Sequence, residues 1–327
     1  MVRLTNHPAH HLGGIVKTWL SNLSLRWKLI GAFLAAGLVP MAVIGVISLQ
    51  NASGSLKDDA KVTQSDVAFN AVDKLDRNLF ERYGDVQAYA QSAPAESMRA
   101  ARVTDWIDTM MGIYTPIYNL MVVADTNGRI VAVNTVDING EPLPEAQKLI
   151  GQDVSGAEWF TTAVGGELED GQTFVEDVHK DELTAAVFGE DSPQHSAMSF
   201  TYPIKRNGRI VGVWTNRFNW DVTGTVLGEV VARQKAAGVE TGELTMVDTK
   251  GTLIASTREG AELFTTDLAE DGTVETAHAG GAGDTTGPRG GGGPDAIGGV
   301  HRPQGDETYP GDGGTVKAPP ESGEARA

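Results

Sequence analysis

The chain has 327 residues, a formal net charge of −17 and no cysteine. The acidity argues against nucleic acid as a partner, because the phosphate backbone would be repelled. The absence of cysteine excludes disulfides, thiolate metal sites and cysteine nucleophiles, and the length is sufficient for one to three domains.

The first predicted element is a membrane-spanning helix over Leu29–Leu49, a stretch without charged residues. At about 1.5 Å per residue, it is long enough to cross a hydrocarbon core of about 30 Å. A cleaved signal peptide is the alternative, but its apolar region is typically shorter, about 7–15 residues. No acidic residue precedes the stretch, and the first one is Asp58, so residues 1–28 are predicted to be cytoplasmic and the rest exported. The basic residues before it are Arg3, Lys17, Arg26 and Lys28.

Residues 50–98 are predicted to form a long stalk helix that ends near Pro94. Apolar residues recur there at spacings of three and four, which places them on one helix face. That face needs a partner, either the following domain or the same helix of a second copy, and we therefore expect a homodimer through the stalk. The residues of this face are Ala68, Val72, Leu75, Leu79, Tyr83, Val86 and Ala90.

Residues 99–222 have the pattern of an α+β module. A short helix over Val103–Met111 precedes a β-hairpin, whose two apolar runs flank the turn Asp125–Gly128. Gly156–Gly166 reads as a second short helix. Further strands are predicted over Thr173–Val178, Ala197–Pro203 and Arg209–Phe218.

The hairpin motif then recurs. D-T-x-G-x-[IL]-[IV]-A begins at Asp125 and again at Asp248, each time after an apolar run. One copy would be a common hairpin turn, whereas two copies in the same context indicate a duplicated module. A linker helix is predicted over Trp220–Ala237. Residues 223–279 are therefore predicted to comprise this linker and a second, incomplete module.

Residues 280–327 are rich in glycine and proline and contain few large apolar residues. Such a composition cannot bury enough apolar surface to fold and predicts a disordered tail. Replacement of the natural continuation after a frameshift is a second interpretation of the same composition.

Several segments resemble a known family. Residues 24–56 are similar to the first transmembrane helix of bacterial methyl-accepting chemotaxis proteins, and ERYGDVQAYAQSAP (81–94) is similar to part of their long sensor helix. FVEDVHKDELTAAVFGED (174–191), SFTYPIKRNGRIVGVWTNRFNW (199–220) and the two D-T-x-G hairpins resemble a double Cache domain. The resemblance covers roughly residues 22–280.

The resemblance implies two PAS-like antiparallel-sheet modules on a shared stalk helix. It also implies an extracytoplasmic sensor in the inner (plasma) membrane, with a small ligand in the membrane-distal module, residues 99–222. The family's second membrane span, HAMP linker and signalling coiled coil find no match after Leu49, so we expect a truncated receptor. The alternatives are the sensor of a histidine kinase or diguanylate cyclase, or a surface-anchored interaction protein without a small ligand.

The resemblance also implies candidate ligand-binding residues. Many amino-acid-binding Cache domains carry R-x-W-Y on the pocket helix, where this chain has Ala157 in place of the arginine that clamps a carboxylate. Where the family has an aspartate for the ligand ammonium, this chain has Asn216 and Arg217. These departures argue against an α-amino acid and favour a small polar or anionic metabolite, with Arg217 as its ionic partner. The full candidate set is Trp159, Phe160, Tyr202, Trp214, Asn216 and Arg217.

Core packing by Trp159 and Phe160, with a solvated Arg217, is the alternative for this set. His179 and His195 lack a third ligand at metal spacing and are expected at the surface. The sequence carries no nucleophile elbow and no zinc-protease motif. It therefore predicts neither an enzyme nor a metal or cofactor site.

Overall fold

The computed structural model describes residues 24–327 except Glu167 and the ranges 239–241, 271–273, 275–282, 290–292, 302–314 and 319–327. The predicted cytoplasmic segment thus lies almost entirely outside the described residues. The chain divides into two compact units, Met1–Asp59 and Ala60–Ala327.

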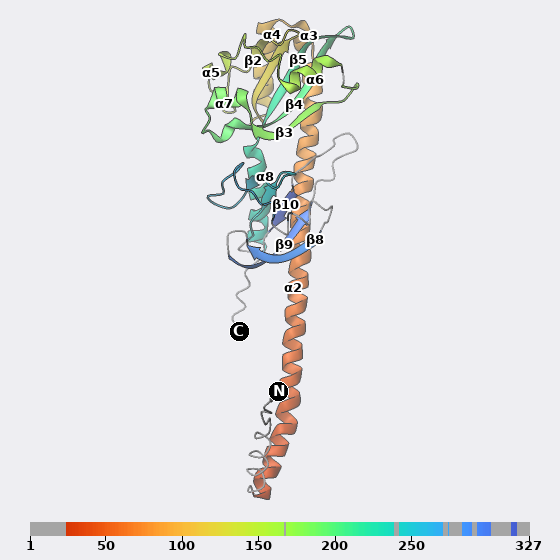
Figure 1. Cartoon of the computed structure of the whole chain (residues 1–327), viewed down its shortest axis with the longest axis vertical. Helices are drawn as coiled ribbons and strands as arrows, with labels where there is room; N and C mark the ends of the chain where they lie inside the picture. The colour runs from red at the N-terminus through yellow and green to blue at the C-terminus, as the bar shows by residue number, and fades with distance from the viewer. Residues whose placement is uncertain are drawn as a thin grey trace, which may run out of the picture. The chain divides into compact units, whose positions relative to one another are not determined.

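The first unit contains the N-terminal part of helix α2 (Leu25–Ala90), the long helix of Figure 1. Its segment Leu25–Leu56 is long and apolar enough to cross a membrane, as predicted, and no residue of its most apolar stretch is buried. Phe33 exposes 78% of its surface and Met41 exposes 71%. Large apolar side chains facing outward all round a helix are typical of a membrane span. Pro40 lies inside the helix, which membrane helices tolerate.

The second unit contains a five-stranded antiparallel sheet with the order β2-β1-β5-β4-β3. Hairpins join β1 to β2 and β4 to β5, as the Gly-containing turns predict. The strands are β1 (Tyr118–Asp125), β2 (Ile130–Val133), β3 (Phe174–Lys180), β4 (Ser196–Arg206) and β5 (Arg209–Asn219).

Helices cover both faces of this sheet and enclose two apolar cores. The larger core lies between the sheet, α2 and α4 (Ala100–Ile113). The smaller core lies on the opposite face, beneath α6 (Glu158–Gly165). The predicted helices at 103–111 and 156–166 are thus confirmed as α4 and α6. Shorter helices also occur at α3 (Ala93–Ser97), α5 (Pro144–Gln147), α7 (Glu182–Phe188) and η1 (Pro193–His195).

The C-terminal part of α2 is the predicted stalk, and every residue of its predicted apolar face is buried. The chain's own modules cover this face, because the larger core includes Ala71 and Val72 of α2 together with Met246 and Ile254 of the second module. A polar contact adds to the packing, since the Tyr118 hydroxyl of β1 donates to Asp85 Oδ2 at 2.7 Å. The apolar face therefore needs no second copy of the chain as its partner.

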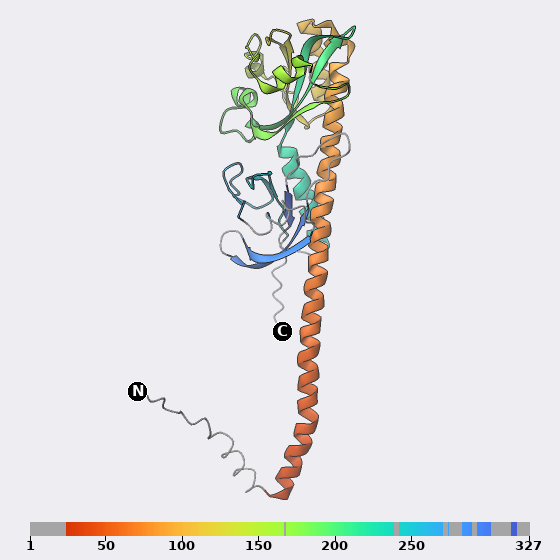
Figure 2. The same ribbon diagram turned by 45° about the vertical axis from the view of Figure 1, so that its right-hand side comes forward.

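A second sheet repeats the arrangement of the first. Its order is β7-β6-β10-β9-β8, which matches the first sheet strand for strand along the chain. Figures 1 and 2 show both sheets beside α2, the second one next to a more N-terminal part of the helix. The strands are β6 (Thr245–Val247), β7 (Leu253–Ser256), β8 (Gly283–Arg289), β9 (Gly293–His301) and β10 (Thr315–Ala318).

The second sheet differs from the sequence prediction in one respect. We expected the module to stop at residue 279 and residues 280–327 to be a disordered tail. In the described parts of this segment, β10 pairs with β6 and β9, and β9 pairs with β8, so three of its stretches add strands to the sheet. The rest of the predicted tail lies outside the described residues. Backbone hydrogen bonds do not depend on side-chain character, which is why a glycine-rich segment can supply strands that its composition does not predict.

The link between the modules is helix α8 (Asp221–Ala236), predicted as the amphipathic segment Trp220–Ala237. It packs along the stalk, where Lys74 of α2 forms an ion pair with Glu229. At its start the Trp220 indole N–H donates to the Ile254 carbonyl of β7 at 2.7 Å. The end of β5 is therefore attached directly to the second module.

The two D-T-x-G turns have the same detailed structure. Asp125 Oδ1 accepts the amides of Asn127 and Arg129, and Asp248 Oδ1 accepts those of Lys250 and Thr252, each at 2.8–2.9 Å. The glycine of each turn has a positive φ, +77° at Gly128 and +89° at Gly251. A Cβ there would lie 2.6 Å from Ser155 and 2.5 Å from Ala269, respectively. This equivalence confirms the predicted duplication.

We expect Gly128→Ala to destabilise the protein by about 2 kcal/mol or more. An alanine in the left-handed region costs roughly 1–2 kcal/mol, and the approach to Ser155 adds a steric cost of about 1–3 kcal/mol. Gly140→Ala is the matched control, because Gly140 has a φ of +80° and open space around it. Thermal unfolding of the full chain in detergent micelles checks this, and equal losses in the two variants would refute the close-packing argument.

Candidate functional site

A row of polar side chains crosses the first sheet on the face that carries α6. The register places Glu176 of β3 opposite Ser199 of β4, and Ser199 opposite Arg217 of β5. The Ser199 hydroxyl donates to Glu176 Oε2. One position along, Thr201 and Thr215 face each other with their hydroxyl oxygens 2.7 Å apart. Polar residues on a covered sheet face are unusual, because that face normally forms an apolar core.

Arg217 is the central group of this row, and only 1% of its surface is exposed. Its Nε donates to Asp181 Oδ2 at 2.7 Å, and one terminal nitrogen donates to Thr215 Oγ1 at 2.5 Å. The guanidinium also lies over the Trp159 ring, 5.4 Å from its centroid. A buried guanidinium requires such neutralisation and hydrogen bonding.

Asp181 supplies the neutralising charge from the start of α7. It is the N-cap of that helix and accepts the Thr184 amide at 2.8 Å. Burial alone would raise the pKa of Asp181, but the Arg217 charge and the Thr184 hydrogen bond outweigh it, helped by His179, and the pKa lies below its usual value. Asp181 is therefore ionised in the neutral pH range.

These groups border a cavity of about 510 Å³. One wall is the segment Asp153–Trp159 leading into α6, and another is β3, through Glu176, His179 and Lys180. The first residues of α7 and the Arg217 side chain complete it. This volume is within the range of small-molecule sites, about 300–1,000 Å³.

The structure brings together some of the predicted site residues. Trp159 and Arg217 line the cavity, as does Ala157. Phe160 is buried behind them and packs edge-on against Trp159, with ring centroids 5.9 Å apart. Of the alternative interpretation, the solvated Arg217 is wrong, because this residue is buried. Trp159 and Phe160 belong to the smaller apolar core, as that interpretation predicted.

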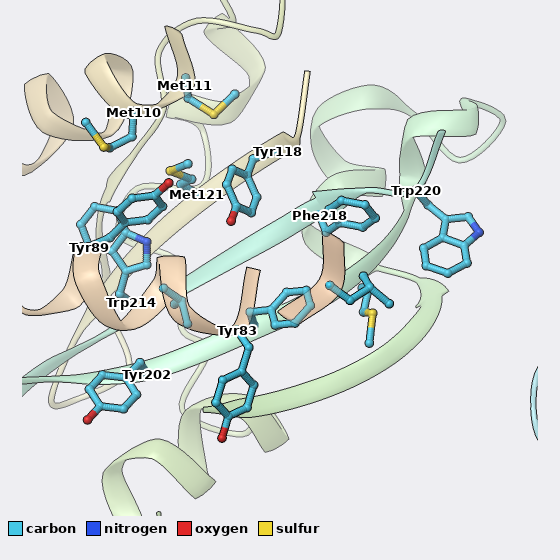
Figure 3. Close-up of a cluster of buried hydrophobic side chains, with 14 of the residues drawn as sticks. Tyr83, Tyr89, Met110, Met111, Tyr118, Met121, Tyr202, Trp214, Phe218 and Trp220 are labelled. Carbon is cyan, nitrogen blue, oxygen red and sulfur yellow. The ribbon is translucent and has the colours of Figure 1, made fainter. Parts of the chain in front are cut away.

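The other three candidates lie on the opposite face of the sheet. Side chains alternate along a strand, so Trp214 and Asn216 point away from the face that holds Thr215 and Arg217. Trp214 packs against Tyr89 of α2 with ring centroids 5.9 Å apart (Figure 3), and its indole N–H donates to Asn216. Tyr202 belongs to the same core. These side chains join the sheet to the stalk and do not line the cavity.

The sequence did not predict the counterion Asp181 or four residues of the polar row, which are Glu176, Ser199, Thr201 and Thr215. A signal for the missed row was present, because Ser199 and Thr201 alternate with Phe200 and Tyr202, as polar and apolar residues do on a two-faced strand. The contribution of Glu176 and Asp181 depends on the fold and had no local signal. His195 was expected at the surface but is buried, because η1, which contains it, packs against α7.

Among the described residues, no group of three or more His, Cys, Asp or Glu side chains is arranged to hold a metal ion. His179 lies in the cavity wall, with Nε2 3.7 Å from Asp181 Oδ2. Its Nδ1 is 2.8 Å from the Asp177 carbonyl.

No family profile and no curated protein matches the sequence, but solved structures share the fold. The ligand-binding domain of the Campylobacter jejuni chemoreceptor Tlp3, in complex with 4-methylisoleucine, matches with a TM-score of 0.54 at 11% identity, over 81% of this chain and 92% of that one. The extracellular domain assigned to a histidine kinase, mmHK1S-Z3, matches with a TM-score of 0.50 at 13% identity, over 83% and 94%.

An extracellular ligand binding receptor from Desulfohalobium retbaense matches with a TM-score of 0.51 at 14% identity over 78% of this chain. This chain spans only 39% of that receptor's length. The fold is thus that of these extracellular ligand-binding domains, which agrees with the fold that the sequence resemblance predicted. Identities this low show the fold alone.

We expect Asp181→Asn to lower the stability by about 3–5 kcal/mol at pH 7, because it leaves the buried Arg217 charge without its counterion. The pKa of Asp181 is lower in the folded than in the unfolded chain. Its contribution is therefore complete above the unfolded pKa of about 3.9 and is lost as the pH falls through the folded value. Thermal unfolding of the full chain between pH 7 and pH 3 should show a weaker acid dependence in the variant.

Asp170→Asn is the matched control for this prediction. Asp170 also forms an ion pair, with Lys205 at 2.7 Å, but its side chain is exposed. Exposed pairs contribute little to stability. A loss in Asp170→Asn as large as that in Asp181→Asn would show that burial of the pair is not the cause.

Proposed function

We propose that the chain is the sensor part of a membrane-anchored receptor, and that its first module binds a small polar metabolite outside the cytoplasm. The observation that carries the proposal is the cavity, which is bordered by the buried Arg217–Asp181 pair and by Glu176. Polar groups at the base of a cavity forgo apolar burial, and a ligand that contacts them accounts for the arrangement.

The comparisons support a binding role rather than an enzymatic one. A solved domain of this fold comes from a chemoreceptor and was determined with a small amino acid, 4-methylisoleucine. We favour a chemotaxis receptor, because residues 24–56 resemble the first transmembrane helix of that family. The histidine kinase remains the second candidate, supported by the match to mmHK1S-Z3. The cavity would have the same role in both.

The charge distribution supports an outward-facing sensor. The four basic residues before the predicted span have no acidic residue among them, and all 43 acidic residues follow it. Basic flanks remain in the cytoplasm, so the two sheets would lie outside the cell or in the periplasm.

Filling the cavity should abolish ligand binding. Gly156 lines the cavity, and a Cβ built on it meets nothing within 4 Å, so Gly156→Trp places an indole there without a backbone clash. A metabolite at 100 times its Kd stabilises the folded protein by about 2.7 kcal/mol. We expect a panel of small polar and anionic metabolites to include one that raises the unfolding temperature of the full chain, and this shift to vanish in Gly156→Trp.

Gly112→Trp is the control, because Gly112 also has open space for a Cβ and does not line this cavity. It should keep the ligand-induced shift. A shift that survives in Gly156→Trp would show that the ligand binds elsewhere. The absence of any shift with the whole panel would count against a small-molecule sensor and favour an interaction protein.

We also propose that the receptor is a homodimer through the stalk. The chain's own modules cover the main apolar face of α2, but two large apolar side chains of the stalk stay exposed, Val62 at 63% and Phe80 at 42%. They are separated by about five helical turns, so they lie on one side of α2. A second copy of the helix would cover both.

A single cysteine at position 80 tests the dimer in a chain that has no cysteine of its own. We expect Phe80→Cys to form disulfide-linked dimers in membranes under mild oxidation. Asn70→Cys, exposed on a different side of α2, should link much less. Equal linking would contradict the predicted interface. The thiol introduced by Phe80→Cys should also react with a membrane-impermeant maleimide on intact cells if the stalk lies outside.

A further inference from the structure

The charges in the cavity identify the chemical class of its ligand. Arg217 was expected to bind an anionic ligand, but in the structure its charge is already used. Its Nε donates a hydrogen bond to Asp181 at 2.7 Å, and a terminal nitrogen donates another to the Thr215 hydroxyl. The guanidinium also lies over the Trp159 ring. An anionic ligand would have to compete with a carboxylate that is itself buried and held by a helix amide.

With this pair neutralised, the remaining charges of the lining are mostly negative. Glu176, Glu158, Glu182 and Asp153 carry carboxylates, and Lys180 carries the one further permanent positive charge among the lining residues. Asp153 has a distant partner in Arg129, 3.7 Å away, and His179 Nε2 lies 3.7 Å from Asp181 Oδ2. The cavity thus has a negative potential, which attracts cations and repels carboxylates.

Glu176 is the carboxylate best placed to bind a ligand. It is half-buried in the cavity wall, and its partner Ser199 is fully buried beside Arg217 on the next strands. One of its oxygens, Oε2, accepts the Ser199 hydroxyl, which fixes the side chain. A fixed, partly desolvated carboxylate makes a strong charge-assisted hydrogen bond to an ammonium group.

We propose that the ligand carries a primary ammonium group, which binds Glu176, and that it needs no carboxylate. The inference rests on the proposed function, since it names the ligand class of the same cavity. Trp159, which also lines the cavity, provides an apolar wall for the carbon chain of such an amine.

The test uses three four-carbon probes of similar size and different charge, 1,4-diaminobutane, 4-aminobutanoate and butanedioate. Each is titrated into the full chain in detergent micelles, and binding is followed by thermal unfolding and calorimetry. We expect 1,4-diaminobutane to bind and to raise the unfolding temperature, 4-aminobutanoate to bind more weakly, and butanedioate to have no effect. Stronger binding of butanedioate than of 1,4-diaminobutane overturns the inference.

Variants show whether the amine binds at the proposed place. Glu176→Gln should weaken 1,4-diaminobutane by about tenfold or more, the loss expected for one charge-assisted hydrogen bond. Glu190→Gln removes an exposed charge that does not line the cavity and should bind as the original does. Gly156→Trp should abolish binding, which separates the cavity from general attraction of cations to an acidic protein. Unchanged affinity in Glu176→Gln overturns the assignment.

The inference and the proposed function can fail separately. If the three amine-bearing or dicarboxylate probes leave the protein unchanged but another metabolite of the broad panel binds in a way that Gly156→Trp abolishes, the sensor function holds and the amine assignment is wrong. If no compound of either set binds, both are wrong.

Discussion

The buried ion pair between Arg217 and Asp181 is the constraint on which the first module depends. A guanidinium with 1% exposure needs a counterion and several acceptors, and these come from different elements. Asp181 lies at the start of α7, Thr215 lies on β5 beside Arg217, and Trp159 lies on α6. One side chain thus joins the sheet to both helical segments that form the cavity walls. An apolar residue there would satisfy packing, but it would not orient those segments through directional bonds.

The duplicated architecture explains why the stalk helix needs no partner for its main apolar face. Both sheets have the same strand order, and side chains of both modules contribute to the core that α2 completes. Neither sheet could cover that face alone, because the face extends along several turns of helix. The equivalent turns at Gly128 and Gly251, each with a positive φ and a close backbone neighbour, show that the second copy preserves local geometry as well as topology.

The sequence predicted those parts of the fold that depend on local pattern. The apolar span, the stalk face, the hairpin turns and the repeat all have a periodicity or turn signal, and the structure contains each. Two kinds of feature were not predicted from the sequence. Strands β8–β10 form from a glycine-rich segment whose pairing is made by the backbone, and the cavity combines residues that are distant in sequence, such as Glu176 and Arg217. The position of Trp214 and Asn216 outside this cavity has a simpler cause. Their residue types suited a pocket, but strand alternation assigns them to the other face.

That alternation gives β5 two functions at once. Arg217 faces the cavity, whereas Trp214 and Phe218 pack towards the stalk. The residue after the strand, Trp220, is hydrogen-bonded to β7 of the second module. Side chains in a close-packed core cannot move independently. A ligand that altered the position of Arg217 would therefore act on a strand already in contact with Tyr89 of α2 and with Ile254. The cavity and the stalk lie on opposite faces of the same sheet, so such a change would reach the stalk through β5 itself, without a separate chain of residues.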